Sequence, residues 1–227
     1  MKLDQAYLKV KDLEMRIGLQ EFYGLGDFQE TLPLLFVCGQ QRAGKSSLVN
    51  RLTGVVTEDD DRFIVTVPRG HDVDEFNFMS GKVCFRHVQS KRDIVLVESS
   101  KRVTNGDASI SAWFADRADL ILIVFDAANL DIDEELRMNI ESFKDHKKKV
   151  RLVLNKSDRV GTQQLVKTYG VLMWTMSQIW QGCDVPKALV GAFGSDQVVI
   201  EDHRNWLSSE SADLYKGKME IFLDALL

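Results

Sequence analysis

Residues 34–54 have the sequence LLFVCGQQRAGKSSLVNRLTG, and this stretch decides the fold. It opens with an apolar run at residues 34–38, which has the length and composition of a strand buried on both faces. The octet that follows, residues 39–46, fits G-x-x-x-x-G-K-[ST] at every fixed position. A helix is predicted over residues 47–52, so the octet joins a buried strand to a helix, which is the context in which this motif binds phosphate.

The residue types in the octet suit phosphate chemistry. Gly39 and Gly44 let the backbone wrap a phosphate and aim its N–H groups inward, where the helix N-terminus adds a favourable field. Lys45 supplies a positive charge for the β- and γ-phosphates, and the hydroxyl of Ser46 is a Mg²⁺ ligand. The alternative is a tight strand-to-helix turn with an exposed lysine, but the full match in this context favours a nucleotide site.

Outside the octet, short apolar runs alternate with longer stretches of helical periodicity. We expect strands at residues 34–38, 64–67, 82–88, 94–97, 120–125, 151–154 and 188–193, and helices at residues 3–22, 47–52, 107–118, 131–147, 162–180 and 206–227. Continuous apolar strands that alternate with helices indicate parallel strands covered on both faces. The predicted fold class is therefore α/β, a three-layer P-loop NTPase.

A second motif, Asn155-Lys156-Ser157-Asp158, lies about 110 residues after Lys45 at the end of a predicted strand. The carboxylate of Asp158 can accept two hydrogen bonds from a guanine edge, the stem of Lys156 can pack on the base, and Asn155 can brace the loops. Taken alone, the four residues have an alternative explanation, a polar turn after a strand. Their position after the phosphate loop indicates the GTPase class, because nucleotide kinases with the same loop lack them.

Composition and charge exclude several other classes. The 227 residues are 44% hydrophobic and 28% charged with a net charge of −5, which excludes a disordered or fibrous chain and argues against a nucleic-acid partner. Cys38, Cys84 and Cys183 show no metal-ligand or disulfide spacing, which favours a reducing, cytoplasmic compartment. We expect no signal peptide in residues 1–10 and no membrane-spanning helix, since the longest apolar run is residues 120–125.

Three further segments resemble the EH-domain-containing (EHD) ATPases of the dynamin superfamily. They are WFADRADLILIVFDAANLDIDEEL (113–136), VRLVLNKSDRVGTQQLVKTYGVLMW (150–174) and GAFGSD (191–196). The resemblance implies a dynamin-type G domain that forms a homodimer, binds a nucleotide with Mg²⁺ and drives assembly on membranes. It also implies a cytoplasmic protein of membrane trafficking and endocytosis, acting at the periphery of endosomal or plasma membranes. The nucleotide is GTP or ATP, because the family prefers adenine nucleotides despite its N-K-x-D motif.

The resemblance also sets the domain organisation that we expect. Residues 31–205 form the G domain. Residues 1–30 and 206–227 are expected to be flanking helices, stubs of the helical membrane-binding region that the family carries.

The chain departs from the family pattern around the γ-phosphate. Where the family has its switch threonine, residues 56–63 are VTEDDDRF, and alignment through Phe63 puts acids at the position of the Mg²⁺-binding residue. The alternative is that Thr57 slides into this position, although the adjacent carboxylates would repel a triphosphate unless a metal intervenes. The family's Asp-Thr-Pro-Gly is replaced by Glu98-Ser99-Ser100-Lys101. Glu98 then takes the place of the aspartate that holds Mg²⁺ through a water. The glycine whose N–H senses the γ-phosphate is lost. Gly194 stands where the family has a tryptophan beside the base, which leaves the base preference open. Hydrolysis is therefore expected to be slow or absent.

Two loop residues are catalytic candidates through the resemblance. Arg42 stands where most dynamins have serine and where guanylate-binding proteins and atlastins have an arginine, so it resembles a finger supplied by the phosphate loop itself. A surface arginine that pairs with the acidic residues 58–61 is an equal alternative. Gln41 aligns with a dynamin glutamine that orients water, although a plain polar loop residue also fits. The residues assigned to the nucleotide are Gly39, Gln41, Arg42, Ala43, Gly44, Lys45, Ser46, Ser47, Asn155, Lys156 and Asp158, and those assigned to Mg²⁺ are Ser46 and Glu98.

Other candidate residues are expected to have structural roles. Asp126 ends a strand as a metal-binding acid would, but on the wrong strand for this class, so a loop or capping role is favoured. The histidines, His71, His87, His146 and His203, have no spacing typical of a metal site or triad, and surface or packing roles are expected. Residues 147–149 are a solvated basic helix end. The tryptophans, Trp113, Trp174, Trp180 and Trp206, are expected to pack in the core.

Two functions from different classes remain. The first is a nucleotide-binding, EHD-like G-domain protein, a slow NTPase that hydrolyses the β-γ phosphoanhydride bond and couples nucleotide state to self-assembly. The alternative is a pseudo-GTPase that acts as an interaction module without turnover. A small-molecule P-loop kinase is disfavoured because Asn155 and Asp158 complete a base-recognition motif.

Overall fold

The computed structural model describes residues 33–54, 63–68, 85–90, 94–99 and 107–194. These residues form a seven-stranded sheet with the order β3-β2-β4-β1-β5-β6-β7. The strands are β1 (Leu34–Gly39), β2 (Phe63–Pro68), β3 (Phe85–Ser90), β4 (Val95–Glu98), β5 (Leu120–Asp126), β6 (Val150–Asn155) and β7 (Ala188–Val190). The predicted strands are confirmed, and β1, which carries the phosphate loop at its carboxyl end, lies between β4 and β5.

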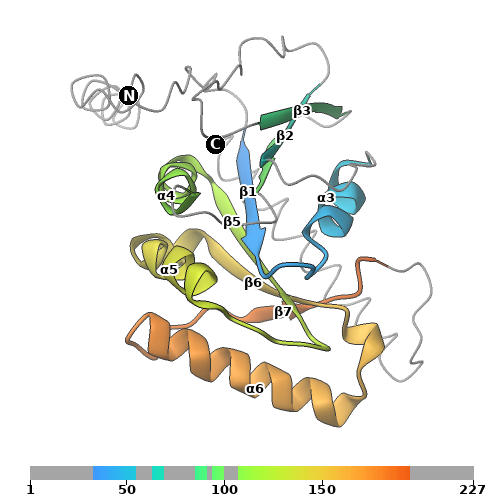
Figure 1. Ribbon diagram of the computed structural model, residues 1–227, viewed down its shortest axis with the longest axis vertical. Helices are drawn as coiled ribbons and strands as arrows, with labels where there is room; N and C mark the ends of the chain where they lie inside the picture. The colour runs from blue at the N-terminus through green and yellow to red at the C-terminus, as the bar shows by residue number, and fades with distance from the viewer. Residues whose placement is uncertain (1–32, 55–62, 69–84, 91–93, 100–106, 195–227) are drawn as a thin grey trace.

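Helices cover both faces of the sheet (Figure 1). They are α3 (Lys45–Thr53), α4 (Asp107–Arg117), α5 (Glu134–Ser142) and α6 (Thr162–Ile179), with short 3₁₀ turns η2 (Lys144–Lys149) and η3 (Ser157–Arg159). Side chains of β1 alternate between two cores: Phe36 packs with α4, α5 and α6, whereas Val37 packs with α3 on the opposite face. The three-layer α/β P-loop NTPase fold predicted from the sequence is confirmed.

The strand directions correct one expectation. The sequence pattern predicted parallel strands throughout, but β2 pairs antiparallel with β4, while β2 and β3 are parallel to each other. Only residues 91–94 separate β3 from β4, and a connection this short cannot return the chain for a parallel crossover, which needs a dozen or more residues. Strands β2 and β3 therefore run opposite to the other five.

The helix predicted over residues 131–147 is divided in two. Helix α5 begins after Asp133, whose side chain accepts a hydrogen bond from the backbone N–H of Leu136 at 2.7 Å, and it ends at Ser142, with Phe143 as its C-cap. Phe143 is fully buried and meets Phe36 edge-on, with ring centroids 6.2 Å apart. Anchoring this ring in the core separates α5 from the basic 3₁₀ turn η2.

Several expectations lie outside the described residues. These are the flanking helices at residues 3–22 and 206–227, the domain boundaries near residues 30 and 205, the switch segment 56–62, and Cys84, His71, His203 and Trp206. Among the helices that the structure describes, none is long and apolar enough to cross a membrane.

Candidate functional site

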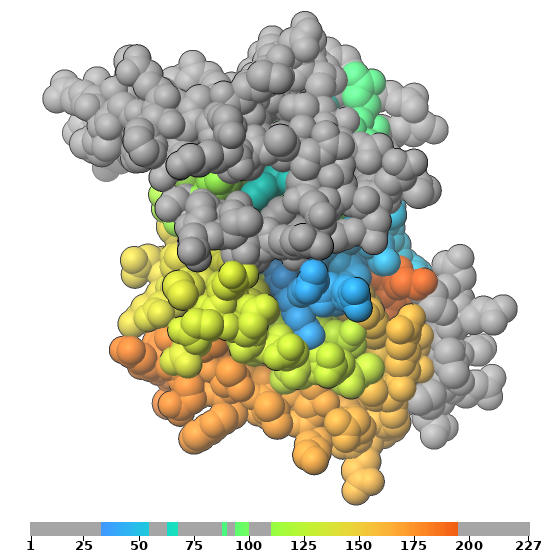
Figure 2. Space-filling view, viewed as in Figure 1, coloured from blue at the N-terminus to red at the C-terminus, as the bar shows by residue number. Residues whose placement is uncertain are grey.

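The phosphate loop follows β1 and leads directly into α3. Gly39 has a φ of 135°, and a Cβ there would lie 2.2 Å from the carbonyl oxygen of Val124 on β5. Gly44 has a φ of 90°, and its Cβ would lie 2.4 Å from the side-chain nitrogen of Asn155. Both glycines are therefore required by close approach as well as by backbone conformation. Figure 2 shows the blue atoms of this region exposed at the molecular surface.

Lys45 lies over the inner side of the loop. Its ammonium donates hydrogen bonds to the carbonyl oxygens of Gly39 at 3.1 Å and Gln40 at 3.2 Å, and the residue is only 5% exposed. Helix α3 begins here with no side-chain cap and no acidic residue in its first turn. An uncapped helix N-terminus beside a buried ammonium is a favourable place for an anion.

The two residues predicted to hold Mg²⁺ lie together. The hydroxyl of Ser46, in the first turn of α3, donates a 2.6 Å hydrogen bond to Oε1 of Glu98, which is buried at the end of β4. A hydroxyl that gives its proton to a carboxylate keeps its oxygen lone pairs for a cation, and hard oxygen donors are the ligands that Mg²⁺ prefers. The donor set therefore fits the cation, and the longer side chain of Glu98 reaches Ser46 from the neighbouring strand.

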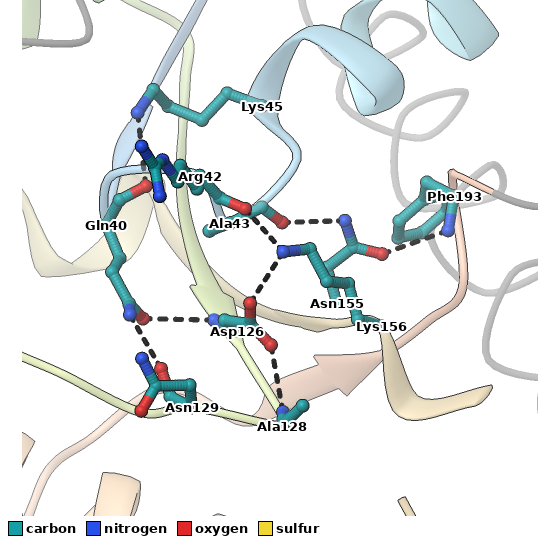
Figure 3. Close-up of polar contacts among 10 residues, drawn as sticks. All are labelled: Gln40, Arg42, Ala43, Lys45, Asp126, Ala128, Asn129, Asn155, Lys156 and Phe193. Carbon is teal, nitrogen blue, oxygen red and sulfur yellow. Dashed lines mark hydrogen bonds and ion pairs between the residues drawn. The ribbon is translucent and has the colours of Figure 1, made fainter. Parts of the chain in front are cut away.

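Asn155 joins the second motif to the first. From the end of β6, its amide nitrogen donates to the carbonyl oxygen of Ala43 at 2.8 Å, and its amide oxygen accepts from the backbone N–H of Phe193 at 2.9 Å (Figure 3). The predicted role of Asn155 as a brace between loops agrees with these contacts. The peptide after β7 is thereby tied to the phosphate loop.

Lys156 and Asp158, the charged residues of the second motif, have different surroundings. The ammonium of Lys156 donates to the carbonyl oxygen of Arg42 and to Oδ2 of Asp126 at 2.6 Å. Asp158 is 5% exposed, and within the described part of the chain its carboxylate has no hydrogen-bonding partner. A carboxylate with open acceptor positions on a mostly buried residue suits a ligand that brings N–H donors.

The two catalytic candidates are exposed residues of the phosphate loop. Gln41 and Arg42 are both exposed, and Arg42 has a left-handed backbone with a φ of 59°. Ala43 is fully buried and Ser47 is half-buried in the first turn of α3. Residues 58–61, the alternative partners of Arg42, lie outside the described residues, so both roles of Arg42 stay predictions.

Sequence reasoning missed part of the network around the loop. Gln40, a variable position of the octet, accepts from the backbone N–H of Asp126 at 3.1 Å and donates to the carbonyl oxygen of Asn129 at 2.6 Å. Asp126 itself accepts from the backbone N–H of Ala128 at 2.9 Å, which confirms its predicted loop role, while its ion pair with Lys156 was not foreseen. Within the sequence, only the polar character of Gln40 and Asp126 beside apolar strands could have signalled this network.

The surface and core candidates mostly behave as predicted, with one correction. The side chain of His146 is 22% exposed, and its ring nitrogen lies 2.9 Å from Oδ1 of Asp116. Trp113 and Trp180 are buried, as expected. Trp174 is not: it is 67% exposed on α6, because the core face of that helix is made by other residues.

Two cysteines can be distinguished by reactivity. Cys38 is buried at the end of β1, and burial raises the pKa of its thiol to about 12, although the nearby charge of Lys45 acts in the opposite direction. Because the thiolate is the nucleophile, we expect native protein treated with iodoacetamide near pH 8 to be modified at the exposed Cys183 but not at Cys38. Peptide mapping by mass spectrometry, with a denatured sample as control, measures this; rapid labelling of native Cys38 would contradict it.

Comparisons with known proteins agree with this architecture. The chain is similar to EH domain-containing protein 1 of Homo sapiens and EH domain-containing protein 3 of Rattus norvegicus, each 39% identical over 135 residues. This region is 59% of the chain but only 25% of either relative, so the match spans about a quarter of their length. No family model matches the chain.

A solved structure is also similar at a low level. Translation elongation factor SelB from Methanococcus maripaludis, in complex with the GTP analogue GppNHp, aligns with a TM-score of 0.45 and 15% identity. The alignment covers 82% of this chain and 35% of that chain. The sequence matches and the P-loop fold together confirm the predicted relationship: the described residues form an α/β P-loop domain similar to the G domain of the EH-domain-containing proteins.

Proposed function

We propose that this chain binds a nucleoside triphosphate, GTP or ATP, and acts as a slow NTPase that couples nucleotide state to self-assembly in the cytoplasm at membrane surfaces. The observation that carries the proposal is the pairing of Ser46 with Glu98 beside Lys45. One buried ammonium and one hydroxyl–carboxylate pair at the start of an uncapped helix are suited to a polyphosphate and its divalent cation. Mg²⁺ held by Ser46 and Glu98 would neutralise charge on the phosphates.

Different groups of the protein bind the phosphates and the base. The loop N–H groups and Lys45 bind the phosphates, while Asp158 accepts hydrogen bonds from the edge of the base. Asn155 holds the two loops in one arrangement through Ala43 and Phe193. A pair of loops held together by the chain's own hydrogen bonds costs less ordering when a ligand binds.

The deciding experiment titrates fluorescent GTP and ATP analogues into the whole chain, with and without Mg²⁺, and then measures phosphate release. Micromolar binding that weakens without Mg²⁺, followed by slow turnover, supports the proposal. Binding without any turnover supports the alternative, a pseudo-GTPase that acts as an interaction module; the replacement of the γ-phosphate-sensing glycine by Lys101 favours that outcome. No binding of either nucleotide would refute both.

Self-assembly is proposed to use the outer face of α6. Val166 and Trp174 are each 67% exposed on this helix and Val171 is 47% exposed, so one face of an otherwise amphipathic helix carries an apolar strip. Gly170 lies between them on the helix surface and has no side chain to project from the strip. A Cβ added there would have no atom within 4 Å. A second copy of the chain is the occupant that the family resemblance favours.

We expect Trp174→Ala to weaken this homodimer strongly, because truncation of a central tryptophan in an interface costs roughly 2 kcal/mol or more. Sedimentation velocity over a range of protein concentrations measures the shift from dimer to monomer. Met138→Ala is the matched control, since Met138 is 50% exposed on α5 rather than α6. An unchanged association constant for Trp174→Ala, or a wild type that stays monomeric at all concentrations, would contradict the proposed interface.

A further inference from the structure

The lysine of the base motif makes its contacts toward the phosphate loop. Lys156 has a left-handed backbone with a φ of 61°, and its ammonium is shared between the carbonyl oxygen of Arg42 and the carboxylate of Asp126 (Figure 3). The Lys156 side chain is 19% exposed and that of Asp126 is 12% exposed. The ion pair is therefore largely shielded from water, where a charge-assisted hydrogen bond is stronger than on the surface.

The peptide that joins Arg42 to Ala43 is fixed on both sides. Its carbonyl oxygen accepts from Lys156, and its N–H donates to the carbonyl oxygen of Gln40 at 3.2 Å. Arg42 is a non-glycine residue in the left-handed region, which costs free energy in an unrestrained chain. The hydrogen bond from Lys156 thus compensates for a strained conformation in the middle of the loop.

The end of β5 holds the loop at a second point. The backbone N–H of Asp126 donates to the side chain of Gln40, and that side chain continues to the carbonyl oxygen of Asn129. Asp126 therefore contacts Gln40 directly and reaches Arg42 through Lys156. Asp126, which is 86 positions away from Gln40, therefore helps to hold two of the four variable residues of the octet, Gln40 and Arg42.

We propose that Asp126 is a positioning residue for phosphate binding: by holding Lys156 against Arg42, it keeps the phosphate loop in its anion-receiving shape. The inference rests on the proposed nucleotide binding and deepens it, because it assigns Lys156 to the phosphates as well as to the base. Loss of the carboxylate has two effects of opposite sign. It removes a negative charge near an anion site, which favours phosphate, and it releases the loop, which disfavours phosphate; the strain at Arg42 makes the second effect larger.

The test is Asp126→Asn, which keeps an oxygen for the N–H of Ala128 but replaces the acceptor of Lys156 with an amide. Calorimetry with Mg²⁺ and either tripolyphosphate or the preferred nucleotide measures affinity. Tripolyphosphate has no base, so it reports on the phosphate loop alone. We expect the affinity for both ligands to fall roughly tenfold. This fold-change corresponds to the free energy that a non-glycine residue costs in the left-handed conformation. Asp116→Asn is the matched control, because it removes the carboxylate that pairs with His146 on the surface.

A double-mutant cycle separates positioning from general damage. With Lys156→Met as the second substitution, Asp126→Asn should cause no further loss of tripolyphosphate affinity, since the group that it positions is gone. If Asp126→Asn does not fold, as judged by circular dichroism, Lys156→Gln breaks the same ion pair from the other side and carries the same expectation for tripolyphosphate, which has no base.

The outcomes distinguish the two levels of the proposal. A loss confined to the nucleotide, an unchanged affinity or a gain in tripolyphosphate affinity would each overturn the positioning role while leaving nucleotide binding intact. A wild type that binds neither ligand would overturn the proposed function itself. Equal losses for both ligands together with non-additivity in the cycle support the role of Asp126.

Discussion

Replacing Lys45 by alanine is expected to lower nucleotide affinity by roughly a hundredfold or more, which would abolish detectable binding in a micromolar assay. Lys45 is the buried cation nearest the uncapped start of α3, and its ammonium is aimed across the loop by the carbonyl oxygens of Gly39 and Gln40. A charged hydrogen bond to a phosphate in a partly desolvated site is worth more than a neutral one. Alanine removes both the charge and the donors.

Fluorescence titration with GTP and ATP analogues measures this loss, and circular dichroism shows whether the variant is folded. Lys148→Ala is the control, because Lys148 is an exposed lysine in η2, outside the loop, and its removal changes the net charge by the same amount. A folded Lys45→Ala protein that keeps wild-type affinity would refute the phosphate-loop interpretation.

The part of the site that was predictable from sequence is the part fixed by local geometry. Gly39 and Gly44 are identifiable because a strand that turns directly into a helix leaves no space for a Cβ at either position. Lys45 and Ser46 follow at fixed offsets in the same turn, and the strand before them is recognisable by its continuous apolar run. These features need no information from distant residues.

The unpredicted part depends on contacts between distant segments. Gln40 and Asp126 are 86 positions apart, and nothing in either local pattern specifies that β1 and β5 are neighbours that bring them together. Lys156 and Asp126 are 30 positions apart and meet only because β5 and β6 pair in register, with Asp126 opposite Asn155. Polar residues at strand ends can be identified from sequence, but their partners follow from the strand order.

The predicted direction of β2 and β3 and the predicted burial of Trp174 were both wrong. The continuous apolar runs predicted parallel strands, but β2, which is also buried, pairs antiparallel with β4. The signal in the sequence was the short segment between the strands predicted at residues 82–88 and 94–97, which leaves no room for a crossover helix. Helix α6 carries apolar residues on its core face, such as Leu172, and on its outer face, such as Trp174. Residue type alone could not tell which of them faces the core.

Arg42→Ala is expected to reduce turnover by about a thousandfold, at the lower end of what an arginine finger contributes, while changing nucleotide affinity only a few-fold. The backbone of Arg42 is held by Lys156 and its side chain is exposed, so the guanidinium can change its position without moving the loop. A planar, permanently charged group that binds two oxygens stabilises the charge that develops on the leaving phosphate.

The measurement separates binding from turnover over a range of protein concentrations. If self-association directs Arg42 toward the nucleotide, wild-type turnover per molecule rises with concentration, whereas that of Arg42→Ala stays low throughout. Arg42→Lys is the matched variant: it retains the charge but loses the planar fork, so a finger role predicts that it recovers only a small part of the rate, while simple charge attraction predicts nearly full recovery. Unchanged, concentration-dependent turnover in Arg42→Ala would make Arg42 an ordinary surface residue, and catalysis would then depend on Lys45 and the groups around Ser46 and Glu98 alone.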